Sequence, residues 1–313
     1  MRNTVKGVDW ERGKRKMRVV PKDKVSFSCN QKNGANYQVD DGEVFWVETD
    51  DCYSGQIQDE KTRRPDIDIS IMDCAVGPIA VKGAMPGDTL CVEILAIDLV
   101  DHGVMVTSKG LGVLGDRITE PDTKIIPIHD GFAWFSDTIR LPLTPMVGVC
   151  GIAPKAGLDI HCAVPGTHGS NMDTKMVKVG SRLYLPVEKE GADLAVGDIH
   201  ACMGDGELSG TGIETAGRIC LRTTVYKDRP VHGPVIETKN DLYFLGTAVT
   251  LKEAIKIAVA ETVEFIEKKR SLNFQDAYRF LRATCDIQIS QVVNDLVTVR
   301  CHLPKFDTGI ETL

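Results

Sequence analysis

Long apolar runs and an excess of positive charge are both missing from this sequence. No stretch approaches the ~20 consecutive apolar residues of a membrane-spanning helix. The 37 lysines and arginines are outnumbered by 44 aspartates and glutamates, which gives a formal net charge of −7. Because such a chain repels nucleic-acid phosphates and anionic lipid surfaces, we expect neither nucleic acid nor membrane as a partner. The opening residues Met1 to Gly7 are polar and lack the apolar core of a signal peptide, so we expect a cytoplasmic protein.

Aromatic residues are also few, at 6% of the chain, whereas 29 glycines and 14 prolines are present. This balance favours many turns and short strands over long helices. The ten cysteines include no CxxC pair, the spacing typical of zinc clusters and redox motifs. Several cysteines, such as Cys91 and Cys150, lie inside apolar runs. We therefore expect buried free thiols in a reducing compartment.

Strand patterns recur along most of the chain. Apolar residues alternate with others between Thr89 and Ile97, and the turn His129-Asp130-Gly131 between two apolar runs predicts a hairpin. The expected strands cover residues 44–49, 89–97, 125–128, 132–135, 182–187, 219–226 and 297–302. These segments predict a mainly β protein.

One late region has helical periodicity instead. Thr250 and Glu253 form a capping box, and apolar residues then recur every three to four positions up to Ile266. Asn273 is expected to open a second helix with Phe274, Ala277, Tyr278 and Leu281 facing inward. The sequence thus predicts two packed, sandwich-like β units, residues 1–150 and 151–313, with an α-hairpin at about 250–283 in the second.

The densest polar segment runs from Gly197 to Glu214. It holds four carboxylates (Asp198, Asp205, Glu207 and Glu214) and His200, separated by five glycines. Glycine permits backbone conformations and close approaches that other residues block. Carboxylates and an imidazole can bind a divalent metal and transfer protons. Taken alone, the same composition equally fits a solvated loop.

Two further segments carry candidate ligands. His168 and Asp173 lie five residues apart in a segment rich in glycine and asparagine, and Asp51 follows an acidic strand end. Each has a simpler interpretation, as a polar turn or a solvated strand end. These segments become informative when their order along the chain is considered.

In that order, the three segments resemble the acetamidase/formamidase family over roughly residues 35–305. The resemblance rests mainly on His168-Gly169-x-Asn171-Met172-Asp173 and on Gly197-Asp198-x-His200-Ala201-x-x-Gly204-Asp205-Gly206-Glu207. The sequence departs from the family at Asp73-Cys74, at Ser170 and at Cys202-Met203, which leaves the identity of the substrate open. The resemblance implies an amidohydrolase that converts a short linear amide, such as formamide or acetamide, to its carboxylic acid and ammonia. It also implies a small substrate pocket.

Amide hydrolysis requires an activated water and a stabilised oxyanion, and a divalent metal provides both. We expect zinc as the cofactor, with Asp51, His168, Asp173 and His200 as its ligands, and an oxygen-rich second position suited to calcium or magnesium. The expected catalytic residues are Glu207 as general base and acid, Asn171 as a donor to the carbonyl, Glu214 as an orienting group with Asp198, and Asp205.

Two alternatives remain open on the sequence. One is a cysteine amidase with Cys202 as nucleophile and Lys175 or a carboxylate as activator. The other is a non-catalytic, metal-loaded β protein that binds a small ligand. In any of these cases we expect a homo-oligomer, dimer or higher, because metabolic enzymes of this size commonly are.

Overall fold

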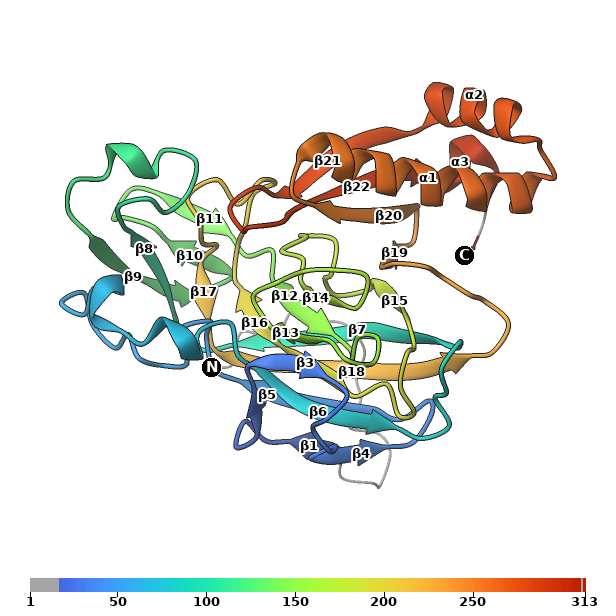
Figure 1. Ribbon diagram of the computed structural model, residues 1–313. Coiled ribbons are helices and arrows are strands. Elements are labelled where there is room, and N and C mark those ends of the chain that lie inside the picture. The colour runs from blue at the N-terminus through green and yellow to red at the C-terminus, as the bar shows by residue number, and fades with distance from the viewer. Residues whose placement is uncertain (1–16, 311) are drawn as a thin grey trace.

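A computed structural model describes residues 17–310, 312 and 313 (Figure 1). Most described strands belong to two large sheets. In spatial order, the nine-stranded sheet contains β1 (Arg18–Val20), β5 (Val44–Thr49), β18 (Gly217–Tyr226), β7 (Thr89–Leu99), β15 (Arg182–Pro186), β19 (Val235–Glu237), β20 (Asp241–Ala248), β22 (Val297–Pro304) and β21 (Asp286–Gln291).

The second sheet has eleven strands and positions the candidate site. Its main order is β11 (Arg140–Pro142), β10 (Phe132–Trp134), β9 (Asp122–His129), β8 (His102–Thr107), β17 (Glu214–Thr215), β16 (Leu194–His200), β12 (Met146–Gly151) and β14 (Gly169–Asn171). β6 (Ala75–Val81) pairs with β16, β2 (Val25–Ser26) and β4 (Tyr37–Val39), whereas β3 (Ser28–Asn30) and β13 (Asp159–His161) form a separate pair.

The two sheets pack face to face through one apolar core. Val47, Ile94 and Ile219 from the first sheet join the same buried cluster as Val147 and Val196 from the second. Alternation along the strands aims these side chains inward. This packing confirms the predicted mainly β, sandwich-like architecture.

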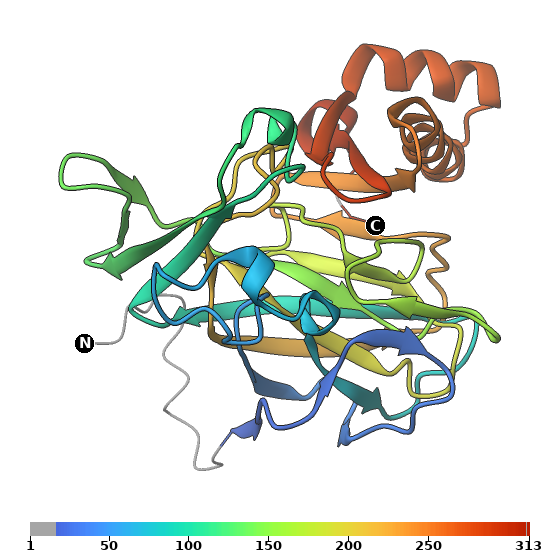
Figure 2. The ribbon, with the colours of Figure 1, turned by 60° about the vertical axis from the view of Figure 1, so that its left-hand side comes forward.

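The predicted strands are found with small shifts at their ends. The strand predicted at 44–49 has those bounds, and the predicted hairpin is formed by β9 and β10, with Phe132 opposite His129. Strands β8 to β11 project from the body as an arm (Figure 2). Both large sheets draw strands from either side of residue 150, so the boundary there is not a division between sheets and stays a prediction. The polar opening segment, Met1 to Gly7, lies outside the described residues.

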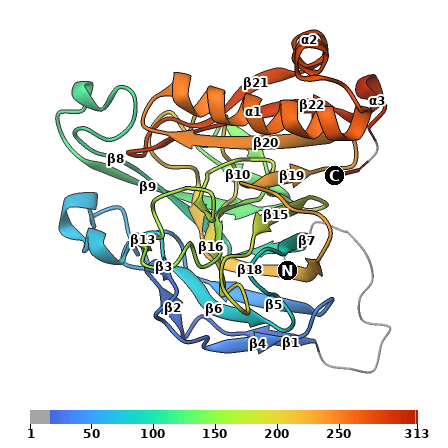
Figure 3. The same ribbon diagram turned by 45° about the vertical axis from the view of Figure 1, so that its right-hand side comes forward.

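The two late helices are α1 (Leu251–Arg270) and α2 (Phe274–Thr284), and a short α3 (Lys305–Thr308) follows β22. Thr250 caps α1 by accepting a hydrogen bond from the Glu253 amide, as the capping box predicts. Figure 3 shows α1 lying along β20 and β22. The approach is close, because a Cβ on Gly246 would lie 2.0 Å from the Ala254 carbonyl oxygen.

The predicted inward face of α2 is only half correct. Ala277 and Leu281 are buried, but Phe274 and Tyr278 are 60% and 52% exposed and stack on each other at the surface. A single helix that packs on one neighbour buries only a narrow apolar stripe. The rest of the predicted apolar face, Phe274 and Tyr278, is therefore exposed to solvent.

The prediction of free thiols, most of them buried, is confirmed. All ten cysteines are free thiols, and eight of them are buried. Within residues 17–310, the short 3-10 helices η2 (Arg64–Asp66), η3 (Ile69–Ile71) and η4 (Gly115–Arg117) lie in connecting loops. No helix in the described part of the chain is long and apolar enough to cross a membrane.

Candidate active site

A cluster of acidic side chains surrounds one histidine beneath a cavity of about 140 Å³. We call Asp173, Asp198, Glu207 and Glu214 the carboxylate cluster, His200 its histidine, and this cavity the inner cavity. All five side chains are buried, with exposures between 1% and 7%. Burying so many carboxylates around one imidazole is unfavourable unless a cation or protons compensate their charge. The cluster is therefore a functional-site candidate.

His200 lies at the centre of this cluster. Its Nε2 is 3.1 Å from Glu214 Oε2, 3.3 Å from Asp198 Oδ1 and 3.9 Å from Asp173 Oδ1. Glu214 Oε1 accepts a hydrogen bond from the Gly212 amide at 2.8 Å, whereas its Oε2 has no hydrogen-bond partner of good geometry. Three carboxylates thus face one ring nitrogen.

Strand pairing in the second sheet brings these residues together. His200 is directly opposite Glu214 in the β16–β17 pair, and Val149 of β12 pairs with both Asn171 of β14 and Gly197 of β16. β14 and β16 therefore flank β12 and run in the same direction, so the segment that follows β14 lies close to the end of β16. That arrangement places Asp173 beside Asp198 and His200.

Gly148 on β12 leaves the space that two of the carboxylates occupy. A Cβ at this position would lie 2.3 Å from Asp198 Oδ2 and 2.7 Å from Asp173 Oδ1. Gly212 plays a similar part on the other side, where a Cβ would lie 2.7 Å from His200 Nδ1. Missing side chains at these two points allow the cluster to form.

Backbone strain is concentrated around the inner cavity. Five non-glycine residues near it adopt positive φ: Asp73 (51°), Ser170 (73°), Asp173 (39°), Asp198 (57°) and Glu207 (48°). Each such conformation costs about 1–3 kcal/mol and persists only where the surrounding structure enforces it. Their gathering at one place supports a functional role for the cluster.

Burial and mutual charge shift the pKa values of these groups. Burial and the charge of Asp198 raise the pKa of Asp173 to about 7. Burial raises the pKa of Glu214 to about 8 against the opposing charge of His200. Burial and the charge of Asp173 also raise the pKa of Glu207 well above its usual value. At neutral pH and without a metal, the cluster therefore retains protons on its carboxyl groups.

The other two groups of the site, His200 and Asp198, remain charged instead. Burial opposes protonation of His200, but the charges of Glu214 and Asp198 outweigh it and raise the pKa of the imidazole well above its usual value. Burial likewise opposes ionisation of Asp198, yet the charge and hydrogen bond of His200 lower its pKa. An imidazolium–carboxylate pair at the centre of the cluster results.

Two predicted metal ligands lie apart from this cluster. The Asp51 carboxylate caps a turn by accepting hydrogen bonds from the Tyr53 and Gly55 amides, at 3.0 and 2.9 Å. His168 is buried beside Cys29, whose pKa is lowered to about 5, first by a hydrogen bond from Cys162 and then by His168. Spacing along the chain does not reveal that the loop 168–173 turns its two ends toward different neighbours.

Asp205 and Asn171 also have partners other than those predicted. Asp205 accepts two hydrogen bonds from Arg300 Nη2, at 2.8 and 2.7 Å, and lies 3.0 Å from Lys175 Nζ. With its amide nitrogen facing Asp173, Asn171 donates to both Asp173 oxygens, at 2.9 and 2.8 Å. Asp205 thus fixes its loop to the first sheet. Asn171 donates to the Asp173 carboxylate rather than into an open position where a substrate carbonyl would lie.

Sequence reasoning missed two residues of the inner cavity. Asp73 and Cys52 both line it, although their segments gave no motif for these side chains. Burial and the charges of Asp198 and Asp173 raise the pKa of Asp73 well above its usual value. The sequence did give one signal at Asp73, because this residue departs from the family pattern.

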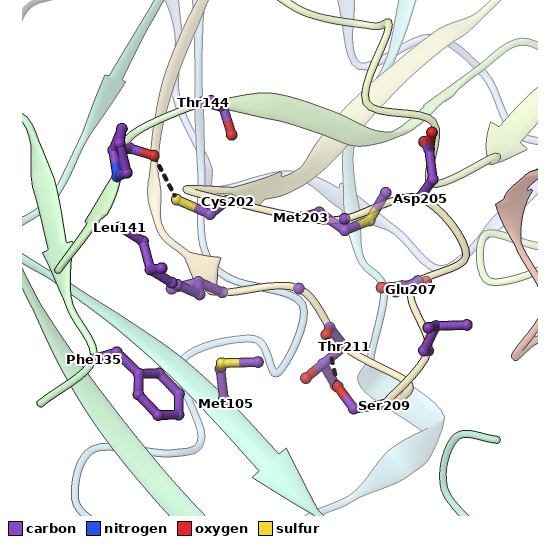
Figure 4. A pocket seen from close by; sticks show the side chains of 15 residues that line it. Met105, Phe135, Leu141, Thr144, Cys202, Met203, Asp205, Glu207, Ser209 and Thr211 are labelled. Atoms are coloured by element: carbon purple, nitrogen blue, oxygen red, sulfur yellow. Dashed lines mark hydrogen bonds between the residues drawn. The ribbon is translucent and has the colours of Figure 1, made fainter. Parts of the chain in front are cut away.

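A larger cavity of about 540 Å³ adjoins the inner one, and we call it the outer cavity (Figure 4). Glu207 and Thr211 line both cavities. Cys202 also lines the outer cavity, where its Sγ donates to the Pro142 carbonyl at 3.2 Å and burial raises the pKa of its thiol. Lys175, the predicted activator of Cys202, is paired with Asp205 instead.

Two sets of side chains in this region have the donor types of a metal site. The ligand atoms of Asp173, His200 and Glu207 all lie within 4.8 Å of one another, as do those of Cys52, Asp198 and Glu214. Imidazole and carboxylate are donors that zinc accepts. The first set therefore fits a divalent ion on chemical grounds.

Comparison with known proteins identifies the family that the chain matches. The acetamidase/formamidase family model matches residues 34–163 and 159–305. A formamidase of Methylophilus methylotrophus is 28% identical over 283 residues, which cover 69% of each chain. The crystal structure of an acetamidase from Bacillus halodurans has a TM-score of 0.91 at 37% identity and covers 94% of this chain and 100% of that one.

A predicted acetamidase/formamidase from Thermoanaerobacter tengcongensis, also known from its crystal structure, has a TM-score of 0.91 at 38% identity and covers 94% of this chain and 98% of that one. The resemblance drawn from the sequence motifs is thereby confirmed, as is the predicted class of enzyme, an amidohydrolase. A family match across nearly all of the described residues leads to one conclusion. This chain belongs to the acetamidase/formamidase family.

Proposed function

We propose that this protein hydrolyses a short linear amide, such as formamide or acetamide, to its carboxylic acid and ammonia with the help of a divalent metal ion. The observation that carries the proposal is the buried His200 Nε2, which has three carboxylates within 3.9 Å. The relatives named formamidase and acetamidase support the substrate class.

The ligand set that we propose differs from the one expected from the sequence. Asp173 and His200 are retained, and Asp198 takes the place of Asp51 and His168, because its Oδ1 lies 3.3 Å from His200 Nε2. This set combines one imidazole with carboxylate oxygens, which suits zinc. Binding requires a neutral imidazole and ionised carboxyl groups, so an ion would displace the protons that the cluster holds.

A second ion such as calcium or magnesium fits this structure poorly. The second set of donors shares Asp198 with the proposed ligands and otherwise offers the Cys52 thiol and Glu214. Calcium and magnesium take oxygen ligands, and a thiol disfavours both. We therefore base the mechanism on a single ion.

Glu207 is the proposed proton-transfer group. Asp173, Asp198 and His200 would hold a divalent ion, which would supply a Lewis acid to activate water and polarise the amide carbonyl. Glu207 accepts the proton that water loses and gives it to the leaving nitrogen, so the products are the carboxylic acid and ammonia. Its raised pKa and its position between the two cavities suit both steps.

The other residues of the cluster position these groups. Asn171 and Asn294 both donate to Asp173, the latter at 3.3 Å, which fixes the orientation of the carboxylate. Glu214 contacts His200 Nε2 and is itself anchored by the Gly212 amide. Contacts of this kind tune metal affinity and catalytic geometry.

The test combines metal analysis with an ammonia-release assay. Purified protein should contain a divalent metal, exhaustive chelation should abolish ammonia release from formamide and acetamide, and added zinc should restore it. Undiminished turnover in verified metal-free protein would refute metal dependence. Complete lack of ammonia from every short amide, in metal-loaded protein, would refute the hydrolytic function and favour the non-catalytic alternative.

The cysteine-amidase alternative makes a different prediction. The thiol of Cys202 has a raised pKa and donates to the Pro142 carbonyl, and its predicted activator Lys175 is paired with Asp205, which disfavours the thiolate that a nucleophile needs. Activity should therefore survive Cys202→Ala. Its loss, with the metal content unchanged, would restore that alternative.

We also propose a cytoplasmic homo-oligomer. Ten free cysteines support a reducing compartment. The arm of strands β8–β11 exposes Ile139 and Leu141, at 49% and 36%, which favours contact with another subunit. Light scattering of the purified protein measures the oligomeric state directly.

A further inference from the structure

The outer cavity is much larger than formamide or acetamide requires. Its volume is about 540 Å³, against about 140 Å³ for the inner cavity that adjoins the carboxylate cluster. Since the resemblance implies a small pocket, this space has no role in the hydrolysis of a one- or two-carbon amide. Its lining and its position next to Glu207 indicate what it binds.

The lining is mainly apolar and comes from three parts of the chain. The arm contributes one residue from β8 and two from its outer part, and the segment after β16 contributes three: Met105, Phe135, Leu141, Met203, Leu208 and Ile213. In Figure 4, Phe135 and Leu141 lie at one end of the cavity and Glu207 lies at the other. Methionine side chains adapt to ligands of different shape.

Charged groups are few in this lining, and none favours a charged ligand. Only Asp205 and Glu207 carry carboxylates there. Asp205 is neutralised by Arg300 and Lys175, and Glu207 belongs to the carboxylate cluster. An anionic chain would be repelled and a cationic chain would find no free carboxylate except the catalytic one.

The two cavities meet at Glu207 and Thr211, which line both. Thr211 is buried, and its hydroxyl interacts with that of Tyr53, although within the described residues neither oxygen forms a hydrogen bond of good geometry. A buried hydroxyl without a partner is unfavourable unless a ligand supplies one. A carboxamide passing between Glu207 and Thr211 would supply it.

From these observations we infer that the outer cavity binds the apolar acyl chain of the substrate, so that the enzyme also takes linear or phenyl-bearing amides of about four to eight carbons. The inference rests on the proposed function, because it places the carboxamide at the carboxylate cluster. The acyl chain of the substrate extends past Glu207 and Thr211 toward Met105 and Leu141. Longer amides then gain binding energy that acetamide cannot.

The experiment measures ammonia release by the metal-loaded, full-length protein from acetamide, butanamide, hexanamide and phenylacetamide. Complete transfer of each methylene from water to the cavity raises kcat/KM about fourfold, so we expect an increase of about two- to fourfold per methylene up to hexanamide. Phenylacetamide should also exceed acetamide.

Filling the cavity provides the matched variant. Met105→Trp should remove the preference for hexanamide and leave acetamide turnover within about twofold of the parent. Leu141→Trp fills the same space from the arm and serves if Met105→Trp folds poorly. Met85→Trp, at an exposed position outside the cavity, is the control and should change neither substrate.

Three outcomes would overturn the inference. Acetamide turnover with slower hexanamide turnover would refute it and leave the proposed function intact, as expected if another subunit fills the cavity. A preference for hexanamide that persists in both tryptophan variants would show that the acyl chain of the substrate binds outside the outer cavity. No ammonia from any of the four amides would refute the proposed function together with the inference.

Discussion

His200 and Glu214 are direct partners in the antiparallel pair β16–β17, and the imidazole Nε2 lies 3.1 Å from the carboxylate Oε2. In the same sheet β12 lies between β16 and β14, and Asp173, which follows β14, reaches this imidazole from across β12. Asp198 lies on β16 itself, two residues before His200. Strand register therefore assembles a buried, charged site from segments that lie far apart in the sequence.

Replacing the proposed proton-transfer group should slow catalysis without removing the metal. Glu207→Gln should lower kcat by about 10²–10⁴-fold, because the amide cannot pass a proton from water to the leaving nitrogen. Bound metal, measured by elemental analysis, should stay at the parent stoichiometry. Exposed Glu120→Gln is the control. Loss of the metal in this variant would show that Glu207 is a ligand. A near-normal kcat would show that Glu207 has no part in proton transfer.

Metal affinity should rise with pH. In the metal-free protein the pKa of Asp173 is about 7 and that of Glu214 is about 8, both raised first by burial. Below these values the carboxyl groups hold protons that a metal must displace, so affinity falls as the pH is lowered. We expect a loss of about tenfold per pH unit between about pH 8 and about pH 6 for each proton displaced. Competition with a chelator of known affinity measures this dependence, and a pH-independent affinity would contradict it.

Gly148→Ala should disrupt the site more than the fold. The added Cβ would lie 2.3 Å from Asp198 Oδ2 and 2.7 Å from Asp173 Oδ1, so both carboxylates must move. Overpacking of this kind costs about 1–3 kcal/mol of unfolding free energy. A displacement of about 1 Å can reduce the rate about 100-fold. Gly34→Ala, which adds its Cβ in open space, is the matched control. Parent-like kcat/KM in Gly148→Ala would exclude this pair of carboxylates from the site.

Asp205→Asn should separate stability from chemistry. The fully buried Arg300 donates twice to Asp205, and neutralising the carboxylate weakens the contact that holds the loop after β16 to β22. We expect the free energy of unfolding to fall by about 1–3 kcal/mol, as for other hydrogen bonds to charged groups. Denaturant titration measures this change, with exposed Asp116→Asn as the control. If kcat instead fell about 100-fold in a stably folded variant, Asp205 would be the catalytic group that the sequence suggested.

Local sequence patterns determined the secondary structure well where the responsible interaction is itself local. Thr250 with Glu253 defined the start of α1, and alternation between Thr89 and Ile97 defined most of β7. The motifs around Asp173, His200 and Glu207 likewise identified the family and the segments that carry its chemistry. Caps, pleat alternation and glycine-rich loops act over a few residues, so one stretch of sequence contains them whole.

Only the tertiary structure decided which of those polar residues share a site. His168 stands in the same motif as Asp173, and Asp51 follows an acidic strand end, yet His168 contacts Cys29 and Asp51 contacts turn amides instead of His200. Gly148 also gives no signal in the sequence, because its importance lies in the two carboxylates that occupy the space of its missing Cβ. The outer cavity is likewise formed by the arm and by the loop after β16, which meet only in three dimensions. Register and sheet packing are set by contacts between distant segments, and local pattern does not encode them.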